Sequence, residues 1–215
     1  MRGKNEQKDN TTDNNMGNNQ TSLWKTIGAS NHTDKERQKE DFYATDSVAI
    51  DKLSKAYDIP HNVYEPCCGA GDLSKRLEKL GHNVVSTDLV DRGYGQGGVD
   101  FLLVNEMPFD SYDCCILTNP PFKYATEMVE HALQILPYGC PCIFLMKTTA
   151  LEGKSRYERL YRNGYLQAIY QFKERLLCAK NREFEKMKEG GGSAVAYAFY
   201  VFSAKKCDAP RIYWI

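Results

Sequence analysis

The chain has 215 residues, enough for one well-buried α/β domain but not comfortably for two. Its 28 lysines and arginines balance 28 aspartates and glutamates, and a formal charge of zero argues against a protein that binds polyanions through net charge alone. No apolar stretch is long enough to span a membrane, and the N-terminal residues carry no secretory pattern.

Eight cysteines raise the question of disulfides or metal ligands, but their spacing supports neither. Cys67-Cys68 and Cys114-Cys115 are adjacent pairs, no Cys-x-x-Cys pair occurs, and the four histidines are scattered. Free cysteine is by default a small buried apolar residue. We therefore expect a reduced, cytoplasmic protein without a metal site.

Residues 1 to about 38 are rich in asparagine, threonine, lysine and aspartate and contain few apolar side chains. Such a segment cannot bury enough surface to offset the entropy of ordering it, so we predict a disordered polar tail over 1–38. Residues 39–215 then form a single predicted domain. It opens with a helix on which Ala49, Ile50 and Leu53 mark one apolar face.

Strands and helices alternate through the rest of the domain. Strands are predicted near residues 62–65, 83–87, 99–102, 112–118, 140–147, 166–172 and 194–202, and helices near 72–80, 123–136 and 153–163. Residues 211–215 are predicted as an edge strand or a covering segment. This order predicts an α/β fold with a mostly parallel seven-stranded sheet, covered on both faces, and an antiparallel hairpin at one edge.

A glycine turn follows the first of these strands, in Glu65-Pro66-Cys67-Cys68-Gly69-Ala70-Gly71-Asp72. Strand, glycine turn and helix open a nucleotide-binding βαβ unit, and Gly69 and Gly71 let a ligand approach the main chain. The third glycine of the dinucleotide fingerprint is missing, which suits a cofactor without a pyrophosphate. Asp88 follows the next strand and is placed either to bind ribose hydroxyls or merely to cap a turn.

A second turn, Asn119-Pro120-Pro121-Phe122, directly follows an apolar run. Proline is stiff and cannot donate a hydrogen bond, so the turn offers carbonyl groups. The Asn119 side-chain oxygen and a backbone carbonyl can both accept from a flat amino group, and Phe122 can stack on a planar substrate. The pattern favours alkylation of a delocalised amine, with an ordinary loop after a buried strand as the alternative.

The two turns, in this order, resemble the S-adenosyl-L-methionine-dependent amino-methyltransferases of DNA, in particular the adenine-N6 type of small phage enzymes. Asp41-Phe42-Tyr43-Ala44-Thr45-Asp46 resembles the segment that this family places before its glycine turn, and Asp100-Phe101 resembles its adenine-contacting position. The resemblance spans residues 40–148 with good specificity and 193–215 more weakly. It implies a Rossmann-like methyltransferase fold, S-adenosyl-L-methionine as cofactor and DNA as substrate.

The resemblance also implies roles for individual residues. The implied catalytic residues are Asn119, Pro120, Pro121 and Phe122, and the implied cofactor-binding residues are Tyr43, Thr45, Glu65, Pro66, Gly69, Gly71, Asp88, Leu89, Asp100 and Phe101. Glu65, Tyr43 and Thr45 would face the methionine end of the cofactor, Asp88 its ribose and Asp100 its adenine amine.

A small basic insertion, about residues 151–192, is the segment best suited to contact DNA, although a charge-rich segment is usually a solvated helix face. The chain has no room for a full target-recognition domain, so a homodimer or a partner protein is an alternative source of sequence recognition. Two other functions stay open. One is an amino-methyltransferase acting on RNA or on a protein glutamine, and the other is a catalytically silent nucleic-acid-binding protein on the same fold.

Overall fold

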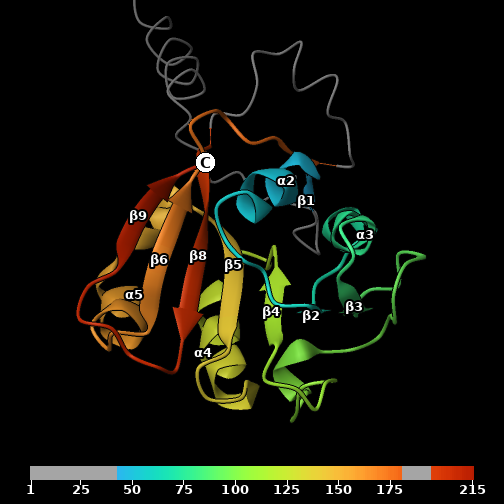
Figure 1. Cartoon of the computed structure of the whole chain (residues 1–215), viewed down its shortest axis with the longest axis horizontal. Helices are drawn as coiled ribbons and strands as arrows, with labels where there is room; N and C mark the ends of the chain where they lie inside the picture. Colours follow the sequence, from blue (N-terminus) through green and yellow to red (C-terminus); the bar gives the residue numbers. More distant parts are fainter. Residues whose placement is uncertain (1–42, 181–194) are drawn as a thin grey trace, which may run out of the picture. The chain divides into compact units, whose positions relative to one another are not determined.

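The computed structural model describes residues 43–180 and 195–215, and a seven-stranded mixed sheet forms their centre. The strands lie in the order β3 (Asn83–Ser86), β2 (Asn62–Glu65), β4 (Cys114–Thr118), β5 (Pro141–Lys147), β8 (Tyr197–Ser203), β6 (Leu166–Gln171) and β9 (Arg211–Trp214) (Figure 1). The first four pair in parallel, β8 is antiparallel to both β5 and β6, and β9 is parallel to β6. The predicted α/β class is confirmed, with the antiparallel pairs among the late strands.

Parts of the chain lie outside the described residues. These are residues 1–42, which include the predicted tail over 1–38 and Asp41-Phe42, and residues 181–194, which include 181–192 of the predicted basic insertion. Among the described helices, none combines the length and the apolar character needed to cross a membrane.

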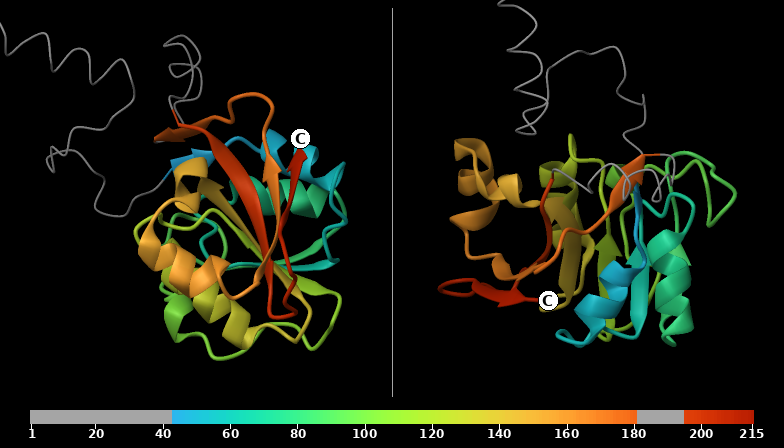
Figure 2. Two further views of the ribbon diagram at one scale, coloured as in Figure 1. Left: turned by 90° about the vertical axis from the view of Figure 1, so that its left-hand side faces the viewer. Right: turned by 90° about the horizontal axis from the view of Figure 1, so that it is seen from above.

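Helices pack on both faces of the sheet (Figure 2). Apolar residues of α2 (Val48–Ser54) and α3 (Asp72–Lys79) join the core on one face, and those of α4 (Ala125–Ile135) join the core on the other. The α4 face also receives Leu160 from a π-helical turn, η3 (Tyr157–Tyr161), which continues the short helix α5 (Lys154–Arg156). A 3-10 turn, η2 (Thr148–Leu151), links β5 to α5.

Alternate residues of the central strands face these two layers. In β4, Cys115 and Leu117 belong to the core beneath α2 and α3, whereas Cys114 and Ile116 belong to the core beneath α4. All five residues of β4 are buried. A strand that is covered on both faces needs apolar side chains at consecutive positions, which explains the unbroken apolar run in the sequence.

The predicted strand at 99–102 is wrong. The carboxylate of Asp100 accepts a hydrogen bond from the Leu102 N–H at 3.0 Å and begins a 3-10 turn, η1 (Phe101–Leu103). Such a side-chain contact competes with strand pairing. Phe101 is buried, with its ring edge-on to the rings of Tyr64 and His131. The seventh strand of the sheet is instead β9, at the outer edge.

A separate two-stranded sheet, which the sequence analysis did not predict, is formed by β1 (Tyr43–Thr45) and β7 (Cys178–Lys180). The two strands are antiparallel, with Thr45 paired to Cys178. Strands of three residues show too little alternation to be detected by pattern. Thr45 of this small sheet accepts a hydrogen bond from the side chain of Asn119, the residue that follows β4.

Candidate functional site

The carboxyl ends of the parallel strands meet at one rim of the sheet and surround a cavity of about 560 Å³. Pro66 to Gly69 follow β2, Asp88 follows β3 and Asn119 follows β4, so three separate loops converge there. Ligands of open α/β sheets bind at this rim, and the volume is typical of a small-molecule site.

Most of the residues singled out in the sequence line this cavity. They are Thr45, Glu65, Pro66, Gly69, Asp88, Leu89, Asp100, Phe101, Asn119, Pro120, Pro121 and Phe122. Gly71 does not line it, and the side chain of Tyr43 is outside the described part of the chain. The glycine turn and the Asn-Pro-Pro-Phe turn therefore share one cavity.

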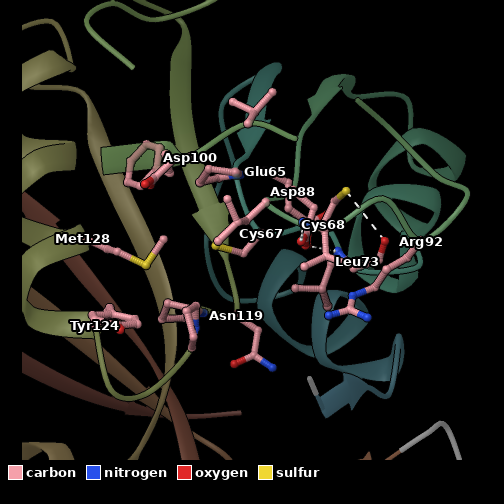
Figure 3. Close-up of a pocket in the computed structure, with 18 of the residues that line it drawn as sticks. Glu65, Cys67, Cys68, Leu73, Asp88, Arg92, Asp100, Asn119, Tyr124 and Met128 are labelled. Atoms are coloured by element: carbon pink, nitrogen blue, oxygen red, sulfur yellow. Dashed lines mark hydrogen bonds between the residues drawn. The ribbon is translucent and has the colours of Figure 1, made fainter. Parts of the chain in front are cut away.

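The cavity also contains side chains that sequence reasoning missed. Figure 3 shows Asp100, Met128 and Tyr124 at one end, Leu73 and Arg92 at the other, and Asn119 between them. Arg92 comes from the loop after Asp88. Leu73, Arg92, Tyr124 and Met128 were not predicted, because only the packing of α3, of the loop after Asp88 and of the start of α4 brings them to the cavity.

The Asp88 carboxylate connects the glycine turn to the loop after β3. One carboxylate oxygen accepts the Gly69 N–H at 2.8 Å, and the other accepts the Val90 N–H at 2.9 Å. Gly69 has φ of +56°, a left-handed conformation that glycine adopts easily. A carboxylate has about four acceptor positions, so Asp88 can cap this turn and still accept from a ligand.

Gly71 has a packing role at the start of α3. Its φ is +79°, and a Cβ at this position would lie 2.3 Å from a ring carbon of Tyr94. The Tyr94 hydroxyl donates to Glu78 at 2.9 Å, and the Lys75 ammonium lies 4.6 Å from the centre of the Tyr94 ring. Gly71 thus allows the loop after β3 to pack against the glycine turn, instead of lining the cavity as predicted.

Glu65 is a buried carboxyl group at the end of β2, only 1% exposed. The Ser74 hydroxyl donates to it, and Ser74 also hydrogen bonds to Ser86 at 2.6 Å. Burial raises the pKa of Glu65 to about 8, even though the hydrogen bond from Ser74 opposes the rise. At neutral pH the group is therefore mainly protonated and neutral.

We expect Glu65→Gln to flatten the pH dependence of stability. The pKa of Glu65 is raised from its ordinary 4.5 to about 8, so between these pH values the folded protein holds a proton that the unfolded chain has released. The free energy of unfolding of the wild type must fall as pH rises through this window, and glutamine removes that contribution. Urea midpoints at pH 5, 6, 7 and 8 should therefore show that the stability of the variant increases relative to that of the wild type as the pH rises.

The control for this comparison is Glu106→Gln at an exposed position. Its midpoints should run parallel to those of the wild type. Parallel curves for Glu65→Gln as well would contradict the raised pKa.

Asn119 and Phe122 form the second half of the site. The Asn119 side-chain N–H donates to the Thr45 hydroxyl at 2.9 Å. The Phe122 ring is half-buried, with the Lys147 ammonium 4.4 Å from its centre and the Tyr197 ring 6.0 Å away at 31°. The turn is therefore anchored by contacts to β1, β5 and β8.

Comparison with known proteins identifies the fold. No protein-family model matches this sequence, and no curated protein matches it. A candidate class I S-adenosylmethionine-dependent methyltransferase from Listeria monocytogenes is 12% identical with a TM-score of 0.51, over 91% of this chain and 71% of that one. A candidate RNA methyltransferase from Pyrococcus horikoshii is 16% identical with a TM-score of 0.51, over 86% and 98%.

A third similar structure is a modification subunit of a candidate type I restriction enzyme from Vibrio vulnificus YJ016. It is 15% identical with a TM-score of 0.50, and the match covers 92% of this chain but 50% of that one. The chain has the Rossmann-like methyltransferase fold. Identities this low establish the architecture alone, because one fold serves many functions.

Within this methyltransferase fold, the cysteines of the cavity are poor nucleophiles. Burial raises the pKa of Cys67 well above its usual range and that of Cys68 to about 12, so both are neutral thiols at physiological pH. All eight cysteines are free. Over residues 43–180 and 195–215, no group of three or more His, Cys, Asp or Glu side chains is arranged to hold a metal ion.

The described part of the basic insertion is bound into the methyltransferase fold. Arg159 forms ion pairs with Glu127 and Glu130 of α4, and Arg162 pairs with Glu158. Arg156 donates to backbone carbonyls of η2 and of the residue after it. Arg159 therefore joins η3 to α4, and Arg156 joins α5 to η2, whereas Arg162 pairs within its own helical turn.

Proposed function

We propose that the protein transfers a methyl group from S-adenosyl-L-methionine to the exocyclic N6 amine of adenine in DNA. One observation carries the proposal: the Asn-Pro-Pro-Phe turn and the glycine turn with Asp88 line the same cavity. The groups that would accept from a target amine therefore line the same cavity as those that would bind a nucleoside-type cofactor. The methyltransferase fold and the neutral thiols agree with direct transfer to nitrogen.

The side chains of the cavity fit this cofactor chemically. Asp100, beside Phe101 and Met128, would accept from the adenine amine, and Asp88 would accept from the ribose hydroxyls. Pro66, Gly69 and Leu89 would line the path between them. At the opposite end lies Arg92, and Asp72 also lines the cavity. Their positive and negative charges would match the carboxylate and the ammonium of a methionine. When bound, the cofactor supplies a methyl group on a positively charged sulfur.

Asn119 and Pro120 would act on the target amine. The nitrogen is a poor nucleophile because its lone pair is shared with the ring. Acceptance of its two hydrogens by the Asn119 side-chain oxygen and the Pro120 carbonyl favours a more pyramidal nitrogen, whose lone pair then points toward the methyl group. The acceleration comes from alignment and from accepting charge as it develops on nitrogen. No strong base is needed, because the proton becomes acidic after transfer.

Phe122 would hold the target base outside the helix. Enzymes that modify a base in duplex DNA take it out of the stack, and an aromatic ring beside Asn119 offers a surface for it. The Lys147 ammonium lies over the face of this ring. A base that stacks on the same face would displace Lys147, and the displaced ammonium could then contact the DNA.

Phe122→Ala should lower methylation of duplex DNA by about 10- to 100-fold, because a stacking surface for one base is lost. Cofactor affinity should barely change. Methylation rates on a duplex oligonucleotide and calorimetry with S-adenosyl-L-methionine measure the two effects. Phe122→Tyr keeps the ring and should retain most activity, whereas an equal loss of cofactor binding in Phe122→Ala would count against this role.

The test of the function is to incubate the protein with isotopically labelled cofactor and methylation-free DNA, RNA or protein in parallel. Label recovered as N6-methyladenine from DNA is the expected result. Label recovered in RNA or in a protein glutamine would show that RNA or protein, and not DNA, is the substrate. Cofactor binding without any methyl transfer would indicate a catalytically silent binding protein. We expect the enzyme to act in the cytoplasm, with a second copy or a partner protein contributing to sequence recognition.

A further inference from the structure

The contact between Thr45 and Asn119 joins two parts of the chain that are 74 positions apart. Thr45 ends strand β1 of the small sheet, and Asn119 follows the central strand β4. The Asn119 side-chain nitrogen lies 2.9 Å from the Thr45 oxygen. Thr45 is only 4% exposed, so water does not readily replace this hydrogen bond.

The orientation of the Asn119 amide decides whether it can serve the proposed reaction. An asparagine amide has an accepting oxygen and a donating NH₂ group of nearly equal size. Only the oxygen can accept a hydrogen from a target amine, and an amide turned by 180° would present a donor to another donor. A partner that accepts from the NH₂ group keeps the oxygen available for substrate.

The Cys178 sulfur offers the hydrogen of the Thr45 hydroxyl an acceptor. Burial raises the pKa of the Cys178 thiol to about 12, while hydrogen bonds from the hydroxyls of Thr45 and Tyr197 to the sulfur oppose the rise. A threonine hydroxyl has one hydrogen. If that hydrogen points to the Cys178 sulfur, the Thr45 oxygen is left to accept from Asn119. Thr45 and Cys178 face each other in the register of β1 and β7, which holds this geometry.

We propose that Thr45 is a positioning residue that fixes the Asn119 amide with its oxygen toward the target amine. This inference rests on the proposed function for its meaning in catalysis. It replaces the expectation that Thr45 binds the methionine end of the cofactor. The sheet of β1 and β7 would then serve to hold Thr45 against Asn119.

Thr45→Val and Thr45→Ser form a matched pair for the test. Valine keeps the shape of threonine without its hydroxyl, whereas serine keeps the hydroxyl. Thr45→Val should lower kcat on DNA about 10- to 100-fold, the size expected for a misplaced catalytic group, and leave the Kd for S-adenosyl-L-methionine within about twofold. Thr45→Ser should restore most of kcat. A raised Kd with unchanged kcat would assign Thr45 to the cofactor and overturn the proposal.

A second readout does not depend on activity. The side-chain NH₂ resonance of Asn119, assigned by its loss in Asn119→Ala, should be protected from hydrogen exchange in the wild type and in Thr45→Ser. It should lose protection in Thr45→Val, and equal protection in all three proteins would overturn the proposal. If the wild type methylates no DNA but this pattern holds, the proposed function fails and the positioning contact stands.

Discussion

Asn119→Ala should lower the rate of methyl transfer by about 1000-fold, while the affinity for S-adenosyl-L-methionine stays near that of the wild type. The substitution removes the side-chain oxygen that would accept from the target amine and leaves the cofactor end of the cavity intact. Loss of one preorganised group that stabilises developing charge costs about 100- to 1000-fold in rate. Here we expect the larger value, because the same group also orients the nitrogen. Single-turnover rates and calorimetry separate the two quantities.

Asn105→Ala is the matched control, since Asn105 is exposed and lies outside the cavity. Its rate should stay within about twofold of the wild type, as expected for a surface substitution. Substantial turnover by Asn119→Ala would refute the role given to Asn119. A parallel fall in cofactor affinity would indicate that the residue supports the cavity as a whole.

Asp88→Ala should have its main effect on cofactor binding. It would remove the proposed partner of the ribose hydroxyls, and one hydrogen bond to a charged group is worth about 1.5–3 kcal/mol, or roughly 10- to 150-fold in affinity. It also leaves the N–H groups of Gly69 and Val90 without their acceptor, so the free energy of unfolding should fall as well. Calorimetry with the cofactor and urea unfolding measure both.

The comparison variants are Asp88→Asn and Asp110→Ala. Asparagine retains one side-chain acceptor and should give an intermediate affinity, whereas Asp110 is exposed and outside the cavity, so its loss should change little. If Asp88→Ala lowers the free energy of unfolding without lowering the affinity for the cofactor, Asp88 only caps the turn. Turn capping is the alternative role that the sequence left open for this residue.

Local signals explain why much of the sheet and both turns could be predicted. The glycine turn that begins at Glu65 follows the short apolar stretch Val63-Tyr64, and Asn119 with its two prolines follows the apolar run 114–118. Glycine and proline mark turns whatever the rest of the chain does. Parallel strands then bring their carboxyl ends to one rim, so the convergence of Asp88 and Asn119 follows from topology.

The failures have equally physical causes. Residues 99–102 have the apolar character of a strand, but the hydrogen bond from Leu102 to Asp100 stabilises a 3-10 turn instead. Strands β1 and β7 are too short to show a pattern, and their pairing is long-range. Arg92 and Tyr124 reach the cavity only through the packing of a loop and of the segment before α4, which no local period encodes.

The pairing of β1 with β7 also affects how the protein folds during its synthesis. Nearly every residue around the cavity has been translated by the time α4 emerges from the ribosome, yet β7 emerges only after β5 and β6. Until then Thr45 has no partner strand to hold it against Asn119. A nascent chain can thus contain every residue that lines the cavity before β7 is available to hold Thr45 against Asn119, so the amide orientation that we propose depends on a strand synthesised later.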